Sequence, residues 1–114
     1  MLTIDALREY GANVDEGLGR CLNKEEFYLK LVKMAASDAG FEKLEKAVEE
    51  ADLDTAFEAA HALKGVLGNL ALTPVFEPAS ALTELLRARQ PGDYAALLAQ
   101  IAEQRDILRT LCAD

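Results

Sequence analysis

Apolar residues recur every three or four positions along most of this sequence, which is the spacing of one face of an α-helix. The pattern is clear in the middle of the chain, where Glu and Lys separate the apolar positions Leu44, Ala47, Val48 and Ala51. No stretch alternates apolar and polar residues as a half-buried strand does. Residues that favour helices are abundant, and there are only three prolines. The sequence therefore predicts an all-α protein.

The N-terminal third contains signals for three helices. Thr3 is suited to cap a first helix that ends at Gly11, and a short helical turn is expected over 14–22. Asn23 with Glu26 resembles a capping box at the start of the next helix, which should end just before Gly40. The apolar stripe predicted for this helix comprises Phe27, Leu31 and Met34, with Leu29 and Val32 beside it.

A longer helix is expected after the amphipathic segment that begins at Phe41. Asp52 or Asp54 can cap it, Thr55 with Glu58 offers a competing capping box, and its apolar run continues to about Leu70 or Leu72.

Two prolines, Pro74 and Pro78, follow this helix, and a regular helix should not contain both, because the second lacks the amide that its turn requires. We therefore predict that the next helix starts near Pro78 and stops before the break at 90–93, where Asp93 can cap the last helix. The apolar residues of these two helices are Leu82, Leu85, Leu86, Leu97, Leu98, Ile101, Ile107, Leu108 and Leu111. Because the later connections are short, the helices should pack as antiparallel neighbours in an up-and-down bundle.

Length and charge limit the kind of protein. At 114 residues the chain fits a single domain over 1–114. Its formal net charge of −8 opposes binding to nucleic acid or anionic membranes, so protein partners are favoured. Neither a signal peptide nor a spanning helix is recognisable, so we expect a cytoplasmic protein. Cys21 and Cys112 form no metal or redox motif and should be ordinary thiols.

His61 is the only histidine. On a helical wheel it lies about 115° from the centre of the apolar sector of its helix, so it should face solvent. Residues three, four and seven positions beyond it are its surface neighbours, and these are Lys64, Gly65 and Gly68. Each glycine costs the helix about 1 kcal/mol relative to alanine, which suggests a packing or functional reason. Bare backbone beside an exposed imidazole would let another macromolecule come close to it.

An exposed imidazole is neutral for much of the time near pH 7 and can attack phosphorus directly with its lone pair. Lys64 could then offset the added charge and donate hydrogen bonds to the phosphoryl oxygens. The sequence contains no ATP-binding or kinase motif. The phosphoryl donor and any Mg²⁺ should therefore belong to a partner, and we expect no cofactor on this chain and no autokinase activity.

The segment 60–65, Ala-His-Ala-Leu-Lys-Gly, followed by Gly-Asn-Leu at 68–70, resembles the signature of bacterial histidine-phosphotransfer (HPt) domains. The resemblance covers nearly the whole chain and includes the break at 89–93. It implies a four-helix bundle with one or two additional N-terminal helices. It also implies a phosphorelay protein that is not an enzyme and that exchanges a phosphoryl group reversibly with aspartates on response-regulator receiver domains, with Mg²⁺ on the receiver and a sensor or hybrid histidine kinase upstream. We expect a monomer.

Carried over by position, the resemblance makes His61 the phosphoacceptor, Lys64 the residue that contacts the phosphoryl group and Gly65 the close-approach glycine. Ala62 and Gly68 are expected to join them in the partner-binding surface, although packing explains Gly68 equally well. The sequence departs from the family pattern at Val66 and Leu67, where small residues are common, and at Ala71, where glycine is frequent. Leu67 should affect packing, whereas Val66 could narrow the choice of receiver.

Two other functions are compatible with parts of this pattern. A non-catalytic adaptor would keep the docking surface and bind receivers without using His61. A metal or redox protein is the weaker alternative, because one histidine and two separated cysteines give no ligand set of recognisable spacing.

Overall fold

The computed structural model describes residues 1–89 and 92–113, which form seven helices and contain no strand. The helices are α1 (Ile4–Tyr10), α2 (Val14–Arg20), α3 (Glu25–Ala36), α4 (Gly40–Glu49), α5 (Leu53–Asn69), α6 (Thr73–Arg87) and α7 (Tyr94–Cys112). The all-α prediction is confirmed.

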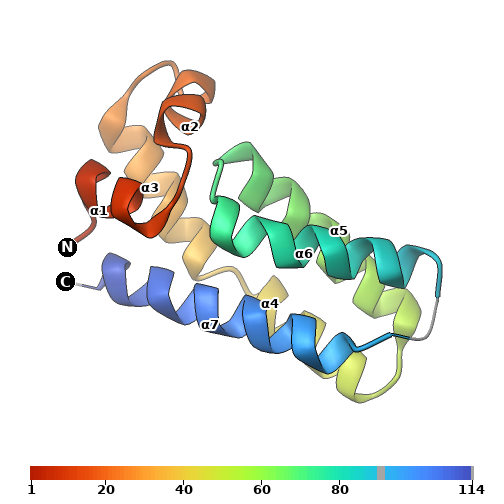
Figure 1. The fold of residues 1–114 in the computed structure, drawn as a ribbon. Coiled ribbons are helices and arrows are strands. Elements are labelled where there is room, and N and C mark those ends of the chain that lie inside the picture. Colours follow the sequence, from red (N-terminus) through yellow and green to blue (C-terminus); the bar gives the residue numbers. More distant parts are fainter. Residues whose placement is uncertain (90–91, 114) are drawn as a thin grey trace.

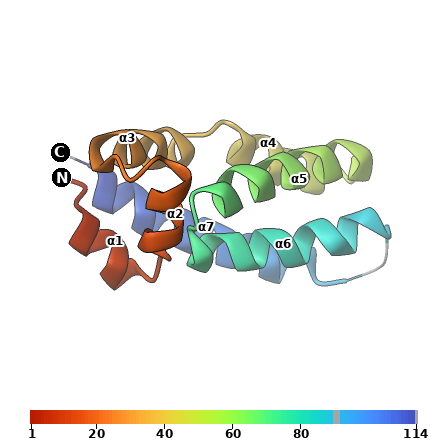
Figure 2. The ribbon, with the colours of Figure 1, turned by 90° about the horizontal axis from the view of Figure 1, so that it is seen from above.

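Helices α4 to α7 form an antiparallel up-and-down bundle, in which α5 packs between α4 and α6, and α7 closes the other side (Figure 1). Helix α3 continues the line of α4, and the two together cover the length of α7 (Figure 2). The short helices α1 and α2 lie at the end of the molecule where the N-terminal part of the chain meets the C-terminal end of α7 (Figure 1). The predicted four-helix bundle is thus the observed architecture, although three helices, α1 to α3, precede it where one or two were expected.

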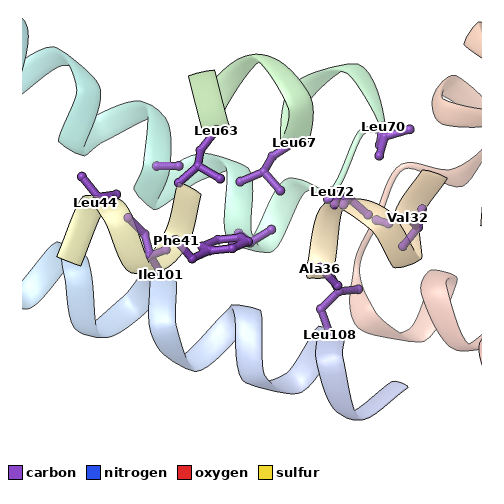
Figure 3. Packing of buried hydrophobic residues seen from close by; sticks show 14 of the residues in the cluster. Val32, Ala36, Phe41, Leu44, Leu63, Leu67, Leu70, Leu72, Ile101 and Leu108 are labelled. Atoms are coloured by element: carbon purple, nitrogen blue, oxygen red, sulfur yellow. The ribbon is translucent and has the colours of Figure 1, made fainter. Parts of the chain in front are cut away.

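Side chains of all four bundle helices meet in one hydrophobic core, to which α6 contributes Leu82. Phe41 and Leu44 of α4, Leu63 and Leu67 of α5 and Ile101 of α7 converge there (Figure 3). Val32, Ala36 and Leu108 extend the core toward α3 and the C-terminal half of α7. Because α5 buries one face in this core, its opposite face is left for solvent and partners.

Several predicted helix ends are confirmed. The Thr3 hydroxyl accepts a hydrogen bond from the Ala6 amide, and Gly11 ends α1 with a left-handed φ of 107°. Asp52, and not Asp54, caps α5 by accepting from the Thr55 amide. Asp93 caps α7 in the same way. The predicted break at Gln90 and Pro91 lies outside the described residues.

The predicted capping box at the start of α3 is wrong. Lys24 precedes the helix and makes no side-chain capping bond, while Asn23 has a left-handed φ of 58°. The Asn23 amide donates to the Leu18 carbonyl at 2.7 Å. Asn23 therefore closes the end of α2 and does not cap α3.

The predicted stripe of α3 is also wrong at Phe27 and Met34, whereas Val32, predicted beside it, is buried. Phe27 and Met34 are 47% and 61% exposed, and Leu31 is only half-buried. The buried face consists of Tyr28, Val32, Ala35 and Ala36. Tyr28 decides this rotation, because its hydroxyl donates to the Leu70 carbonyl at 2.9 Å and burial raises its pKa to about 12.

The prediction that α6 starts near Pro78 is wrong as well, since α6 begins at Thr73 and contains both prolines. Pro74 lies in the first turn, where the missing amide would have had no helical partner. Pro78 leaves the carbonyl of Pro74 without its usual helical donor, but Pro78 is buried and packs in the bundle. Burial in the core thus offsets one lost hydrogen bond near the start of the helix.

Candidate functional site

Helix α5 presents His61 to solvent near its middle, as predicted. The residues that α5 buries are Ala56, Ala59, Ala60, Leu63 and Leu67, so the helix is fixed against its neighbours through the opposite face. Ala62 and Gly65 are exposed beside His61 and carry little or no side chain. The imidazole therefore stands on a low, rigid surface.

His61, Lys64, Gly65, Gly68 and Asn69 line one open hollow on this face, so the structure brings the predicted neighbours together. Two residues that the sequence did not indicate, Arg20 of α2 and Phe76 of α6, complete its lining.

The two glycines of the hollow differ in their surroundings. Apart from the backbone of its own helix and its chain neighbours, a Cβ atom at Gly65 would meet no atom of the described residues within 4 Å, so packing does not require a glycine there. At Gly68 a Cβ would lie 2.8 Å from Cε1 of Phe76, so this glycine makes room for the Phe76 ring. Gly65 consequently costs helix stability without any internal packing gain.

An aromatic ring supports the imidazole. Phe57, one turn earlier on α5, stacks on His61 with ring centroids 5.7 Å apart and planes 19° apart. The guanidinium carbons of Arg87 and Arg89 lie 5.1 and 5.3 Å from the centroid of Phe57, within the range of cation–π attraction. Arg89 is in turn bound to Asp54, with Nη2 2.6 Å from Oδ1. Phe57 thus contacts both His61 and two cations.

Lys64 is paired with α6. Its Nζ atom lies 3.5 Å from Oε1 of Glu84, while Oε2 of Glu84 accepts from Nε of Arg87 at 3.1 Å. The hydrogen bond from Arg87, aided by the charges of Arg87 and Lys64, lowers the pKa of Glu84, so this carboxyl is ionised at neutral pH. Lys64 and Arg87 therefore share one acidic partner.

Arg20 connects α2 to the end of α5. One of its nitrogens donates to the carbonyls of Gly68 and Asn69, at 2.5 and 3.2 Å, and the other pairs with Glu16. These carbonyls belong to the last turn of α5, where helical donors are missing. No spacing rule connects residue 20 to residue 68, so only the packing of α2 on α5 reveals this contact.

The departures from the family pattern occupy two different environments. Val66 is 37% exposed, on the flank of α5 that faces α3. Ala71 has a left-handed φ of 56°, a conformation that glycine adopts more easily than alanine. The backbone therefore explains why glycine suits position 71, and Ala71 is a strained substitute.

Neither cysteine lines the hollow beside His61. Cys21 is buried and Cys112 half-buried, both as free thiols, and burial raises the pKa of Cys112. Within 1–89 and 92–113, no group of three His, Cys, Asp or Glu side chains is arranged to hold a metal ion. No helix in these ranges is long and apolar enough to cross a membrane.

Fold and site together define a helical bundle that displays a single histidine, with a lysine one turn away, on an exposed helix face. The family model of the Hpt domain matches residues 33–112, so the chain belongs to the Hpt domain family. Hpt domains take part in histidine phosphotransfer in phosphorelays, are phosphocarriers rather than catalysts, and interact with receiver domains and kinases. No curated protein and no solved structure gives a significant match to the chain.

Proposed function

We propose that His61 is the phosphoacceptor of this Hpt domain and exchanges a phosphoryl group reversibly with aspartates of response-regulator receiver domains. The observation that carries the proposal is the exposed imidazole next to Gly65, whose missing side chain has no packing role in the chain itself. A small substrate would reach His61 without such clearance. A receiver domain must bring its own backbone close to the imidazole, and the low surface of Ala62 and Gly65 permits this approach.

The transfer step uses one ring nitrogen of His61. Its lone pair attacks the phosphorus of the receiver's acyl phosphate, the N–P bond forms as the O–P bond breaks, and the bonding electrons remain on the aspartate carboxylate. The second ring nitrogen keeps its proton during the attack. The reverse reaction restores the free imidazole. Lys64, three residues along the same helix face, is placed to donate hydrogen bonds to the phosphoryl oxygens.

The remaining parts of the reaction are assigned to partners. Mg²⁺ would be bound by the receiver, where it offsets charge on the transferring group, and a sensor or hybrid histidine kinase would introduce the phosphoryl group upstream. This chain would contribute the nucleophile, its cation and the docking surface, and no autokinase activity.

The test is transfer from a phosphorylated receiver domain, followed as acid-labile, base-stable label on this protein. Wild type should acquire label and His61→Gln should not. Gly65→Leu should slow transfer by at least about tenfold, because a side chain between the partners displaces the reacting atoms. Gly19→Leu is the matched control: Gly19 has equally open surroundings on α2, and it does not line the hollow.

Three results would contradict the proposal. Label that survives in His61→Gln would place the phosphoryl group elsewhere. Receiver binding without any label on wild type would favour an adaptor that does not use His61. Equal rates for Gly65→Leu and Gly19→Leu would remove the argument for close approach. Circular dichroism of each variant checks that the helices are intact.

A further inference from the structure

We propose that Glu84 of α6 is a positioning residue for this site: it holds the Lys64 ammonium group while His61 is unmodified and gives it up to the phosphoryl oxygens once His61 is phosphorylated. The inference rests on the proposed function of His61. It adds a second helix to the phosphorylation site and a residue that sets how strongly the phosphorylated form is favoured.

The resting position of Lys64 supports this assignment. Its Nζ atom lies 3.5 Å from Oε1 of Glu84, which is the only acidic side chain within ion-pair distance of Lys64 among the described residues. Helices α5 and α6 run side by side (Figure 1), and the Lys64–Glu84 ion pair connects them. At this separation the contact is a loose, half-exposed ion pair that can exchange partners readily.

A competing acceptor next to Lys64 appears when His61 is phosphorylated. Residues three apart on a helix face have Cβ atoms about 5–6 Å apart, so the lysine stem can reach a group on the imidazole without moving the helix. A phosphoryl group brings close to two negative charges and three acceptor oxygens, against one charge on Glu84. The ammonium group should therefore move toward the phosphoryl group.

Glu84 can release Lys64 because it has a second partner. Its other oxygen, Oε2, accepts from Arg87 at 3.1 Å, so the carboxylate stays paired after Lys64 leaves. Arg87 also lies over Phe57, which stacks on His61. The contacts thus run from His61 through Phe57, Arg87 and Glu84 to Lys64 and return to His61 along α5. Both positions of Lys64 are compatible with this arrangement.

The competition has a measurable consequence. Lys64 must leave Glu84 before it can bind the phosphoryl group. The energy needed to break the Lys64–Glu84 pair therefore reduces the net stabilisation of the phosphorylated form. Glu84→Gln removes the resting pair and keeps the size of the side chain. The phosphorylated form should then be favoured by about threefold in the transfer equilibrium, the size expected for one exposed ion pair.

The experiment measures how label is divided at equilibrium between one receiver domain and this protein, for four variants. Glu84→Gln should raise the share on His61 by about threefold. Glu58→Gln is the charge-matched control, because Glu58 lies one turn before His61 and its side chain forms no ion pair or hydrogen bond among the described residues. Lys64→Met and the double variant Lys64→Met, Glu84→Gln complete a double-mutant cycle. At protein concentrations well below the dissociation constants of the complexes, the division of label does not depend on docking affinity, so altered docking cannot imitate the effect.

The outcomes separate the possible explanations. Partner exchange requires that the effect of Glu84→Gln disappears in the Lys64→Met background. An equal effect in that background, or an equal effect of Glu58→Gln, would mean simple charge repulsion and would overturn the proposal. No change in Glu84→Gln would overturn it as well. Absence of label on wild type is a different result, which refutes the proposed function of His61 and this assignment with it.

Discussion

Two arginines lie over one phenylalanine ring at two places in this molecule. Between α4 and α7, Arg105 and Arg109 have their guanidinium carbons 5.9 and 5.7 Å from the centroid of Phe41. Between α5 and α6, Arg87 and Arg89 stand in the same relation to Phe57. We call these two helix contacts the α4–α7 seam and the α5–α6 seam. In both seams, carboxylates from α4, α5 or α6 pair with the arginines. The same chemical unit therefore occurs twice.

The two units differ in their burial. Phe41 is 1% exposed, and the Arg105 side chain is 12% exposed where it bonds to Glu45 at 2.8 Å. Arg109 also donates to the Ala36 carbonyl at 2.6 Å, so it connects α7 to the end of α3. Phe57 is half-buried, the Arg87 side chain is 50% exposed, and the ring also stacks on His61. The first unit is a closed structural contact, whereas the second is open to solvent and can change partners.

Truncating each ring should give the largest difference between the seams. Phe41→Ala leaves a cavity in the core and should lower the free energy of unfolding by about 3–5 kcal/mol. Phe57→Ala removes a half-exposed ring and should cost about 1 kcal/mol, while transfer to His61 slows because the imidazole loses its support. Urea unfolding followed by circular dichroism measures the first effect, and the receiver assay measures the second. Equal losses of stability in the two variants would contradict the comparison.

Neutralising one arginine in each seam should give a smaller difference. Arg105→Gln leaves Glu45 without its partner in a partly buried contact and should cost about 1–2 kcal/mol of unfolding free energy. Arg87→Gln should leave stability within experimental error, because exposed pairs are screened by water and salt. The same unfolding measurement at low and high salt distinguishes the two. A loss of stability in Arg87→Gln that matches the loss in Arg105→Gln at both salt concentrations would show that the α5–α6 seam is also structural.

The sequence predicted those parts of the fold that depend on local rules. The exposure of His61 follows from a helical-wheel projection of α5, since that helix has one clear apolar face. The prediction of the buried face of α3 failed because the apolar residues of this helix are spread around nearly its whole circumference. The choice of face depends on a slot formed by Gly17 and the Leu70 carbonyl, which accepts Tyr28. Such a slot brings residues together that are far apart in sequence, and no period reveals it.

The site shows the same limit. Lys64, Gly65 and Gly68 were found because they are neighbours of His61 on one helix. Arg20, Phe76 and Glu84 come from other helices, and their place depends on how α2 and α6 pack on α5. The charged runs Glu42–Glu50 and Glu103–Asp106 look like solvated faces in the sequence. Two of their members, Glu45 and Arg105, join α4 to α7, because the helices face each other there.

Acid titration should give the smallest difference between the two seams. The expected difference follows from the cause of the pKa shift of one carboxyl group in each seam. Glu42 and Glu84 both have a pKa below the ordinary value of 4.5. For Glu42 the first cause is a hydrogen bond from its own backbone amide in the first turn of α4; burial opposes this shift, and a hydrogen bond from Arg109 adds to it. For Glu84 the first cause is the hydrogen bond from Arg87. Each lowered pKa stabilises the fold above pH 4.5, and this contribution is lost as the pH falls through the folded pKa.

Removing the arginines should therefore affect the two carboxylates unequally. In Arg87→Gln the pKa of Glu84 should return most of the way to 4.5, with Lys64 accounting for the remainder. In Arg109→Gln the pKa of Glu42 should stay clearly lowered, because the backbone amide remains. Carboxyl carbon NMR between pH 2 and 7 resolves both titrations. The opposite result would contradict these causes: the pKa of Glu42 would return fully to 4.5, while the pKa of Glu84 would stay lowered.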